Sequence, residues 1–112
     1  MICLETTTVI DYLNDVSEAK QIINSQRDNI LCVTSITIFE VLYGTFVYGG
    51  IEEAQAFFQE LIVLPLAERE ANASAKIQSE LSKKGLLMQI SDVLIAGTCI
   101  ANNCTQIITR DK

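Results

Sequence analysis

The side chains in this sequence that could do chemistry are carboxylates at the borders of apolar runs. Glu5 follows MICL, and Asp111 follows TQIITR. Asp92 opens the apolar run DVLIAG, and Glu40 lies between apolar neighbours in ITIFEVLYG. Carboxylates brought together repel one another and raise one another's pKa values, so a cluster of them needs a cation. Oxygen donors alone would select Mg²⁺ or Mn²⁺.

The composition narrows the chemistry further. No histidine occurs among the 112 residues, which excludes His-dependent triads, His-based acid–base catalysis and most zinc sites. The four cysteines form no CxxC pair, and the first three stand within apolar stretches. We therefore expect reduced, buried core residues and not disulfides or metal ligands, as in a cytoplasmic protein. They are Cys3, Cys32, Cys99 and Cys104.

The bulk properties predict one soluble domain spanning residues 1–112. Hydrophobic residues make up 49% of the chain and charged residues 20%, so the chain can bury a core. A formal net charge of −6 argues against sequence-independent binding to DNA or to an anionic membrane. The longest uncharged stretch, residues 93–109, contains Asn102 and Asn103 and is too polar for a membrane span. Nucleic-acid chemistry remains open where metal ions neutralise the carboxylates.

Apolar strands and amphipathic helices alternate along the chain and would position these carboxylates. The predicted strands span 1–4, 29–35, 62–66 and 105–109, and the predicted helices span 6–14, 15–25, 36–48, 51–61, 67–84 and 91–102. Strands that are apolar throughout are typical of a parallel sheet covered on both faces. In such sheets the ligand crevice lies beyond the carboxyl ends of the strands.

Three of the predicted helices carry capping signals. Asp15 and Glu18 have the spacing of a capping box for the second helix. Thr34 or Ser35 would cap the third helix, and Ser91 would cap the last one.

Most of the polar side chains that could do chemistry fall at the carboxyl edge of the predicted sheet. They are Glu5, Thr6, Glu40, Asp92, Arg110 and Asp111. Asp92 has two interpretations, because an acid in the first turn of a helix also favours the helix dipole. The convergence of four carboxylates favours the other interpretation, in which Asp92 forms a wall of a metal pocket.

The chain resembles the PIN-domain ribonucleases, and most closely the toxins of VapBC-type toxin–antitoxin pairs. The resemblance rests on four motifs that occur in the family's order across almost the whole chain. They are MICLETTTVIDYL, VTSITIFEVLYG, SDVLIAGTCIANN and TQIITRDK. Each motif is weakly specific alone, and the four together form a fairly specific signal.

The resemblance implies an α/β fold, namely a PIN-like three-layer sandwich with a short, mostly parallel sheet of about four strands flanked by helices. It implies a Mg²⁺- or Mn²⁺-dependent endoribonuclease, a homodimer and a cognate antitoxin protein. The acids implied to act at the metal are Glu5, Glu40, Asp92 and Asp111. Thr6 would donate to a water on the metal, and Arg110 would meet the RNA phosphates.

Two features depart from the family's pattern. The first acid is usually an aspartate, and Glu5 carries one methylene more, which leaves two outcomes open: reduced activity, or a site that has relaxed around the longer side chain. The chain also ends just after Asp111, where family members usually continue, as expected of a shortened C-terminal end.

Two alternative functions and the placement of three aromatic residues stay open at this point. A weakened PIN-like domain that mainly binds a partner protein is the main alternative function. A receiver-like phosphoacceptor domain is a weaker one, because LETT and CVTS lack the acids which that class needs. Tyr43, Phe46 and Tyr48 are expected in the core or on a dimer surface.

Overall fold

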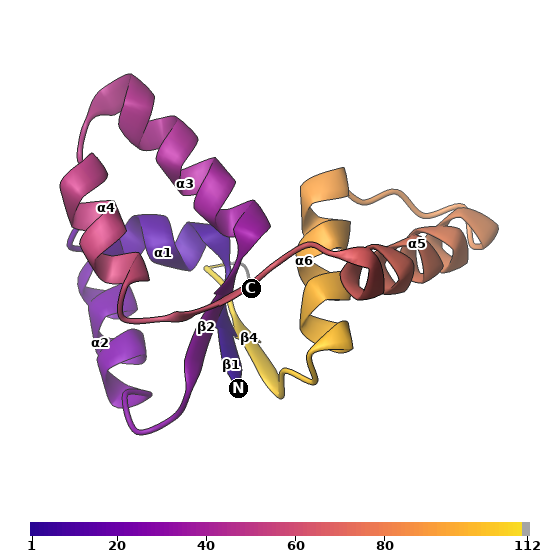
Figure 1. The fold of residues 1–112 in the computed structure, drawn as a ribbon, viewed down its shortest axis with the longest axis horizontal. Helices are drawn as coiled ribbons and strands as arrows, with labels where there is room; N and C mark the ends of the chain where they lie inside the picture. The colour runs from indigo at the N-terminus through magenta and orange to yellow at the C-terminus, as the bar shows by residue number, and fades with distance from the viewer. Residues whose placement is uncertain (111–112) are drawn as a thin grey trace.

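The strands form one parallel sheet in the order β3-β2-β1-β4 (Figure 1). The computed structural model describes residues 1–110. The strands are β1 (Ile2–Leu4), β2 (Leu31–Thr34), β3 (Ile62–Leu64) and β4 (Gln106–Ile108). The helices are α1 (Thr6–Leu13), α2 (Ser17–Ser25), α3 (Ser35–Tyr48), α4 (Ile51–Phe58), α5 (Glu68–Lys83) and α6 (Ile90–Ala101). The predicted α/β class with a four-stranded parallel sheet is confirmed.

Helices cover the sheet from two sides (Figure 1). The first side holds α1 to α4, whose apolar side chains pack with Leu4 and Val33 into the larger core. The second side holds α6, and α5 packs on the outside of α6. Side chains on a strand point alternately to opposite faces, so Cys3 and Cys32 face α6 while their neighbours face the larger core.

The cysteines gather between the sheet and α6. Cys3, Cys32 and Cys99 are buried and Cys104 is half-buried, and all four are free thiols. Cys32 and Cys104 lie in contact, with their Sγ atoms 3.7 Å apart. The prediction of buried core cysteines is confirmed for Cys3, Cys32 and Cys99.

The edge strands depart from the expectation of a sheet covered on both faces. That expectation holds for β1 and β2, whose residues are all buried. In β3, Ile62 and Val63 are 47% and 43% exposed, and Ile107 of β4 is 40% exposed. The helices span the centre of this small sheet and leave part of each edge strand open.

The capping predictions had mixed outcomes. Thr34 caps α3 as predicted, since its Oγ1 accepts the N–H of Thr37 at 3.1 Å. The capping box at Asp15 is wrong, because Asp15 has φ = 61° and reverses the chain before α2 begins. The cap at Ser91 is also wrong, because α6 begins one residue earlier and its N-cap is Gln89.

The aromatic residues of α3 do not lie in the core. Tyr43, Phe46 and Tyr48 are exposed by 66%, 74% and 90%. The core interpretation of these residues is therefore wrong, and the surface interpretation remains. Separately, none of the helices within residues 1–110 is long and apolar enough to span a membrane.

Candidate functional site

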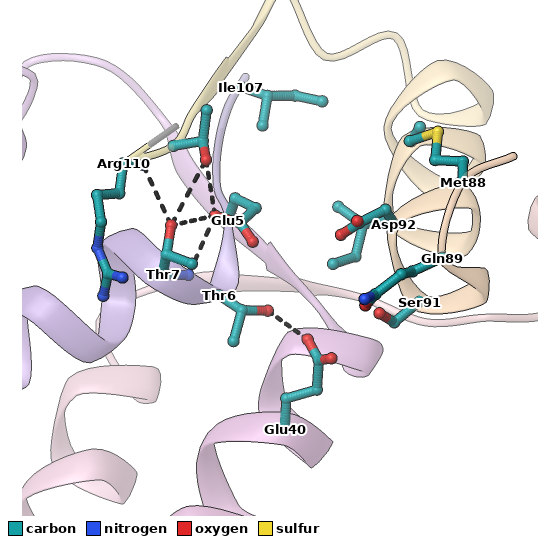
Figure 2. Close-up of a pocket in the computed structure, with 13 residues that line it drawn as sticks. Glu5, Thr6, Thr7, Glu40, Met88, Gln89, Ser91, Asp92, Ile107 and Arg110 are labelled. Carbon is teal, nitrogen blue, oxygen red and sulfur yellow. Dashed lines mark hydrogen bonds between the residues drawn. The ribbon is translucent and has the colours of Figure 1, made fainter. Parts of the chain in front are cut away.

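A cleft of about 660 Å³ opens at the carboxyl edge of the sheet, between α1 and α3 on one side and α6 on the other (Figure 2). Glu5, Glu40 and Asp92 all line it, as predicted from three separate segments of the sequence. Thr6 and Arg110 line it too. The prediction for Asp111 lies outside the described residues.

Glu5 stands at the junction between β1 and α1 and is the N-cap of that helix. Its Oε1 accepts hydrogen bonds from the Thr7 N–H at 3.0 Å, the Thr7 hydroxyl at 2.5 Å and the Thr109 hydroxyl at 2.9 Å. The parallel register pairs Leu4 of β1 with Ile108 of β4, so the next residue of each strand meets at the cleft. Glu5 is therefore held to both α1 and the end of β4.

Glu40 is tied to α1 through a chain of hydroxyl groups. The Thr6 hydroxyl donates to Glu40 Oε1 at 2.6 Å and lies 2.9 Å from the Thr37 hydroxyl. A hydroxyl has one hydrogen, so when Thr6 donates to Glu40, Thr37 must donate to Thr6. Thr6 and Thr37 are both buried, and this chain fixes the direction of Glu40.

Asp92 lies in the first turn of α6, across the cleft from Glu5 and Glu40 (Figure 2). The partial positive charge of a helix N-terminus favours a carboxylate there. The two interpretations of Asp92 from the sequence are therefore compatible, because it both opens α6 and lines the cleft. Gln89 and Ser91 line the same wall.

Arg110 is held by a bidentate ion pair with Asp11 of α1. Its Nε and an Nη lie 2.8 Å and 2.7 Å from the two carboxylate oxygens of Asp11. The guanidinium lowers the pKa of Asp11, and the carboxylate in turn raises the pKa of Arg110. No local pattern in the sequence predicts this pair, because 99 residues separate its members.

Sequence reasoning missed three threonines that hold the acids in place. Thr7 and Thr109 bind Glu5, and Thr37 supports Thr6. For Thr7 and Thr109, the available signal was the threonine run that follows Glu5 at the end of the first strand, together with a threonine after the last strand. Hydroxyl groups at these points lie beside any acid at the carboxyl edge of the sheet.

The groups in the cleft that could bind a cation are mainly carboxylate, hydroxyl and amide oxygens, without histidine or cysteine, and Met88 adds a thioether sulfur. The oxygen donors suit hard divalent cations. Within residues 1–110, no three His, Cys, Asp or Glu side chains are placed to hold a metal ion together. Mg²⁺ keeps several of its waters and commonly binds protein through one or two carboxylates, so carboxylates on separate walls fit such an ion.

The comparisons with known proteins agree with this geometry. The family model of the PIN domain matches residues 2–112. Ribonuclease VapC2 of Rickettsia felis is 27% identical over 90 residues, which cover 77% of this chain and 67% of the relative.

Two solved structures show the same fold. VapBC2 from Rickettsia felis, bound to a DNA fragment from its promoter, is similar with a TM-score of 0.84 and 24% identity, over 100% of this chain and 90% of that chain. DNA-bound VapBC from Salmonella typhimurium is similar with a TM-score of 0.79 and 26% identity, over 92% of this chain and 81% of that chain. With its fold and nearly its whole length matched, this chain belongs to the PIN-domain family.

Proposed function

We propose that this protein is a divalent-metal-dependent endoribonuclease and the toxin of a type II toxin–antitoxin pair. The observation that carries the proposal is the meeting of Glu5, Glu40 and Asp92 at one cleft of a PIN-domain fold. Support also comes from the relative named as a ribonuclease, VapC2, and from the similar VapBC structures. The alternative, a domain that only binds a partner protein, is not favoured by these relatives.

The carboxylates that would hold Mg²⁺ or Mn²⁺, directly or through the waters that the ion keeps, are Glu5, Glu40 and Asp92, together with Asp111. When bound, the ion supplies Lewis acidity toward water and toward the scissile phosphodiester. Without histidine, the proton of the attacking water must go to a carboxylate or to solvent. Glu40 is a candidate for this role, because the buried Thr6 hydroxyl holds one of its carboxylate oxygens at the cleft.

The substrate would be RNA, with Arg110 contributing positive charge at the rim of the cleft. The ion pair with Asp11 holds this guanidinium in place and offsets its charge. On a protein with a formal net charge of −6, such a rim gives weak general attraction for polyanions. Most of the affinity for the scissile phosphate would therefore come from the metal.

The proposed partners are a second copy of this chain and an antitoxin protein. The exposed aromatic side chains of α3, namely Phe39, Tyr43, Phe46 and Tyr48, support self-association, because exposed apolar patches mark interfaces. The VapBC structures with the same fold support an antitoxin partner.

The proposed location is the cytoplasm, which the free thiols suit.

The test is a cleavage assay on structured and unstructured RNA with Mn²⁺ and with EDTA. We expect Asp92→Asn to lose at least about a hundredfold in rate, because a neutral amide is a poor ligand for a hard cation. Asp28→Asn is the matched control, since Asp28 is exposed in the loop before β2, at the opposite end of the sheet. A third arm, Glu5→Asp, should cut faster than the parent if the extra methylene misplaces the carboxylate.

Cleavage by Asp92→Asn at the parental rate would overturn the site. Thermal melts of all variants separate a lost ligand from a lost fold. Cleavage that survives EDTA unchanged would overturn the metal dependence while leaving the family assignment untouched.

A further inference from the structure

We infer that Thr7 and Thr109 are positioning residues that divide the Glu5 carboxylate between two roles. One oxygen, Oε1, is held by the protein, and the other, Oε2, is presented to the cleft. The inference rests on the proposed function, because it concerns how Glu5 would meet the divalent cation. It assigns a role to two residues that do not themselves touch the ion.

The hydrogen bonds to Glu5 are unevenly shared between its two oxygens. Oε1 accepts from three donors, the Thr7 N–H, the Thr7 hydroxyl and the Thr109 hydroxyl. A carboxylate oxygen has two lone pairs, so three donors saturate it. Among residues 1–110, no donor reaches Oε2. Oε2 is therefore the oxygen left to bind a cation, and Glu5 would bind it through one oxygen only.

The two hydroxyl groups belong to different elements and so fix the carboxylate from two sides. Thr7 lies in the first turn of α1, and its hydroxyl also accepts the N–H of Arg110 at 3.1 Å. Two successive hydrogen bonds thus join the residues after β4 to α1 and to Glu5: the Arg110 N–H donates to the Thr7 hydroxyl, which donates to Glu5 Oε1. The Thr8 hydroxyl adds a bond to the Ile108 carbonyl at 3.0 Å. The longer side chain of a glutamate would otherwise swing freely in the cleft.

Thr109 is the member of this pair that depends on tertiary structure. Thr7 is two residues from Glu5 and would meet it in any helix that Glu5 caps. Thr109 meets it only because β4 pairs in parallel with β1 at the sheet edge. Removing the Thr109 hydroxyl therefore loosens Glu5 while its cap on α1 stays in place.

The test compares Thr109→Val, which removes the hydroxyl at nearly constant volume, with Thr109→Ser, which keeps it. Thr105→Val is the matched control, because Thr105 precedes the same strand and its hydroxyl binds the Met1 carbonyl at the opposite end. Titration calorimetry measures the Mn²⁺ dissociation constant of each protein. A ¹H–¹⁵N spectrum of each metal-free protein reports the Thr7 amide, which donates to Glu5.

We expect Thr109→Val to weaken Mn²⁺ binding about tenfold, as the loss of a group that orients a ligand does. The Thr7 amide resonance should shift in this variant, and both properties should return to parental values in Thr109→Ser. Equal dissociation constants in the parent and Thr109→Val would overturn the inference and leave the proposed function standing. Weak binding in both Thr109 variants would assign the effect to packing and overturn the hydroxyl role. No Mn²⁺ binding by the parent would overturn both this inference and the metal dependence.

Discussion

β1 and β2 present different kinds of side chain to the two faces of the sheet. Toward α1–α4 they direct large aliphatic groups, including the fully buried Leu4 and Val33. Toward α6 they direct the thiols of Cys3 and Cys32, which meet Cys99. Small side chains let a helix approach a sheet more closely than large ones do. We call the face that carries α6 the thin face and the face that carries α1–α4 the thick face, after the size of the side chains that β1 and β2 direct to each.

The thin face matters for function because α6 carries Asp92 into the cleft. α6 lies between the cysteine layer and α5, and its contact with α5 is close at Gly97 and Ser74. A helix held tightly on both sides keeps its first turn in a fixed place. The thick face supplies Glu5 and Glu40 from α1 and α3, so the cleft joins one wall from each face.

The two faces should differ most in the free energy of unfolding that is lost when one buried side chain on each face is truncated to alanine. We expect Leu4→Ala to lower the free energy of unfolding by about 3–5 kcal/mol, because it leaves a cavity among aliphatic side chains. Cys3→Ala removes a single sulfur atom and should cost about 1–2 kcal/mol. Urea denaturation with an unchanged m-value measures both. Equal losses in the free energy of unfolding would contradict this difference between the two faces.

A smaller effect should follow from a methyl group added between α6 and α5. A Cβ at Gly97 would lie 2.6 Å from the backbone N and Cα of Ser74, so Gly97→Ala must push the two helices apart. We expect a loss of about 1–3 kcal/mol in the free energy of unfolding. The Mn²⁺ affinity should fall with it if α6 moves.

Gly44→Ala is the control for the Gly97 substitution. Gly44 lies within α3, where a Cβ would meet nothing within 4 Å, so alanine should stabilise the helix by up to about 1 kcal/mol. If both substitutions stabilise the protein, the contact between α5 and α6 is not tight.

The sequence predicted the meeting of Glu5, Glu40 and Asp92 because parallel strands end at one edge of a sheet. It also predicted buried cysteines from their apolar neighbours. The contact between Thr109 and Glu5 could not be predicted, because it depends on the register of β4 against β1, which no local pattern encodes.

The ends of the helices were predicted less well than their existence. Asp15 and Glu18 match a capping box in spacing, but Asp15 adopts the left-handed conformation that turns the chain. Asp and Asn tolerate that conformation and also favour helix caps, so the residue type alone does not choose between them. Ser91 was misplaced for a different reason, because α6 begins one residue before it and Ser91 lies inside the first turn.

The smallest predicted effect concerns the pair that joins α1, on the thick face, to the end of the edge strand β4. Arg110 lowers the pKa of Asp11 below its ordinary value of 3.8 in the folded protein. A lowered pKa in the folded state adds stability above the pKa of the unfolded chain, and that stability is lost as the pH falls through the folded value. Asp11→Asn should therefore be less stable than the parent at pH 7, and the difference should shrink as the pH falls below 3.8.

Thermal melts from pH 7 to pH 2 measure this convergence, with Asp28→Asn as the control, since Asp28 forms no ion pair within residues 1–110. High salt should also reduce the difference, because the Arg110 side chain is 54% exposed and exposed charges are screened. A difference that persists unchanged at pH 2 would mean that Asp11 acts through packing against α2 and β4. In that case the link between α1 and the end of β4 would be steric and not electrostatic.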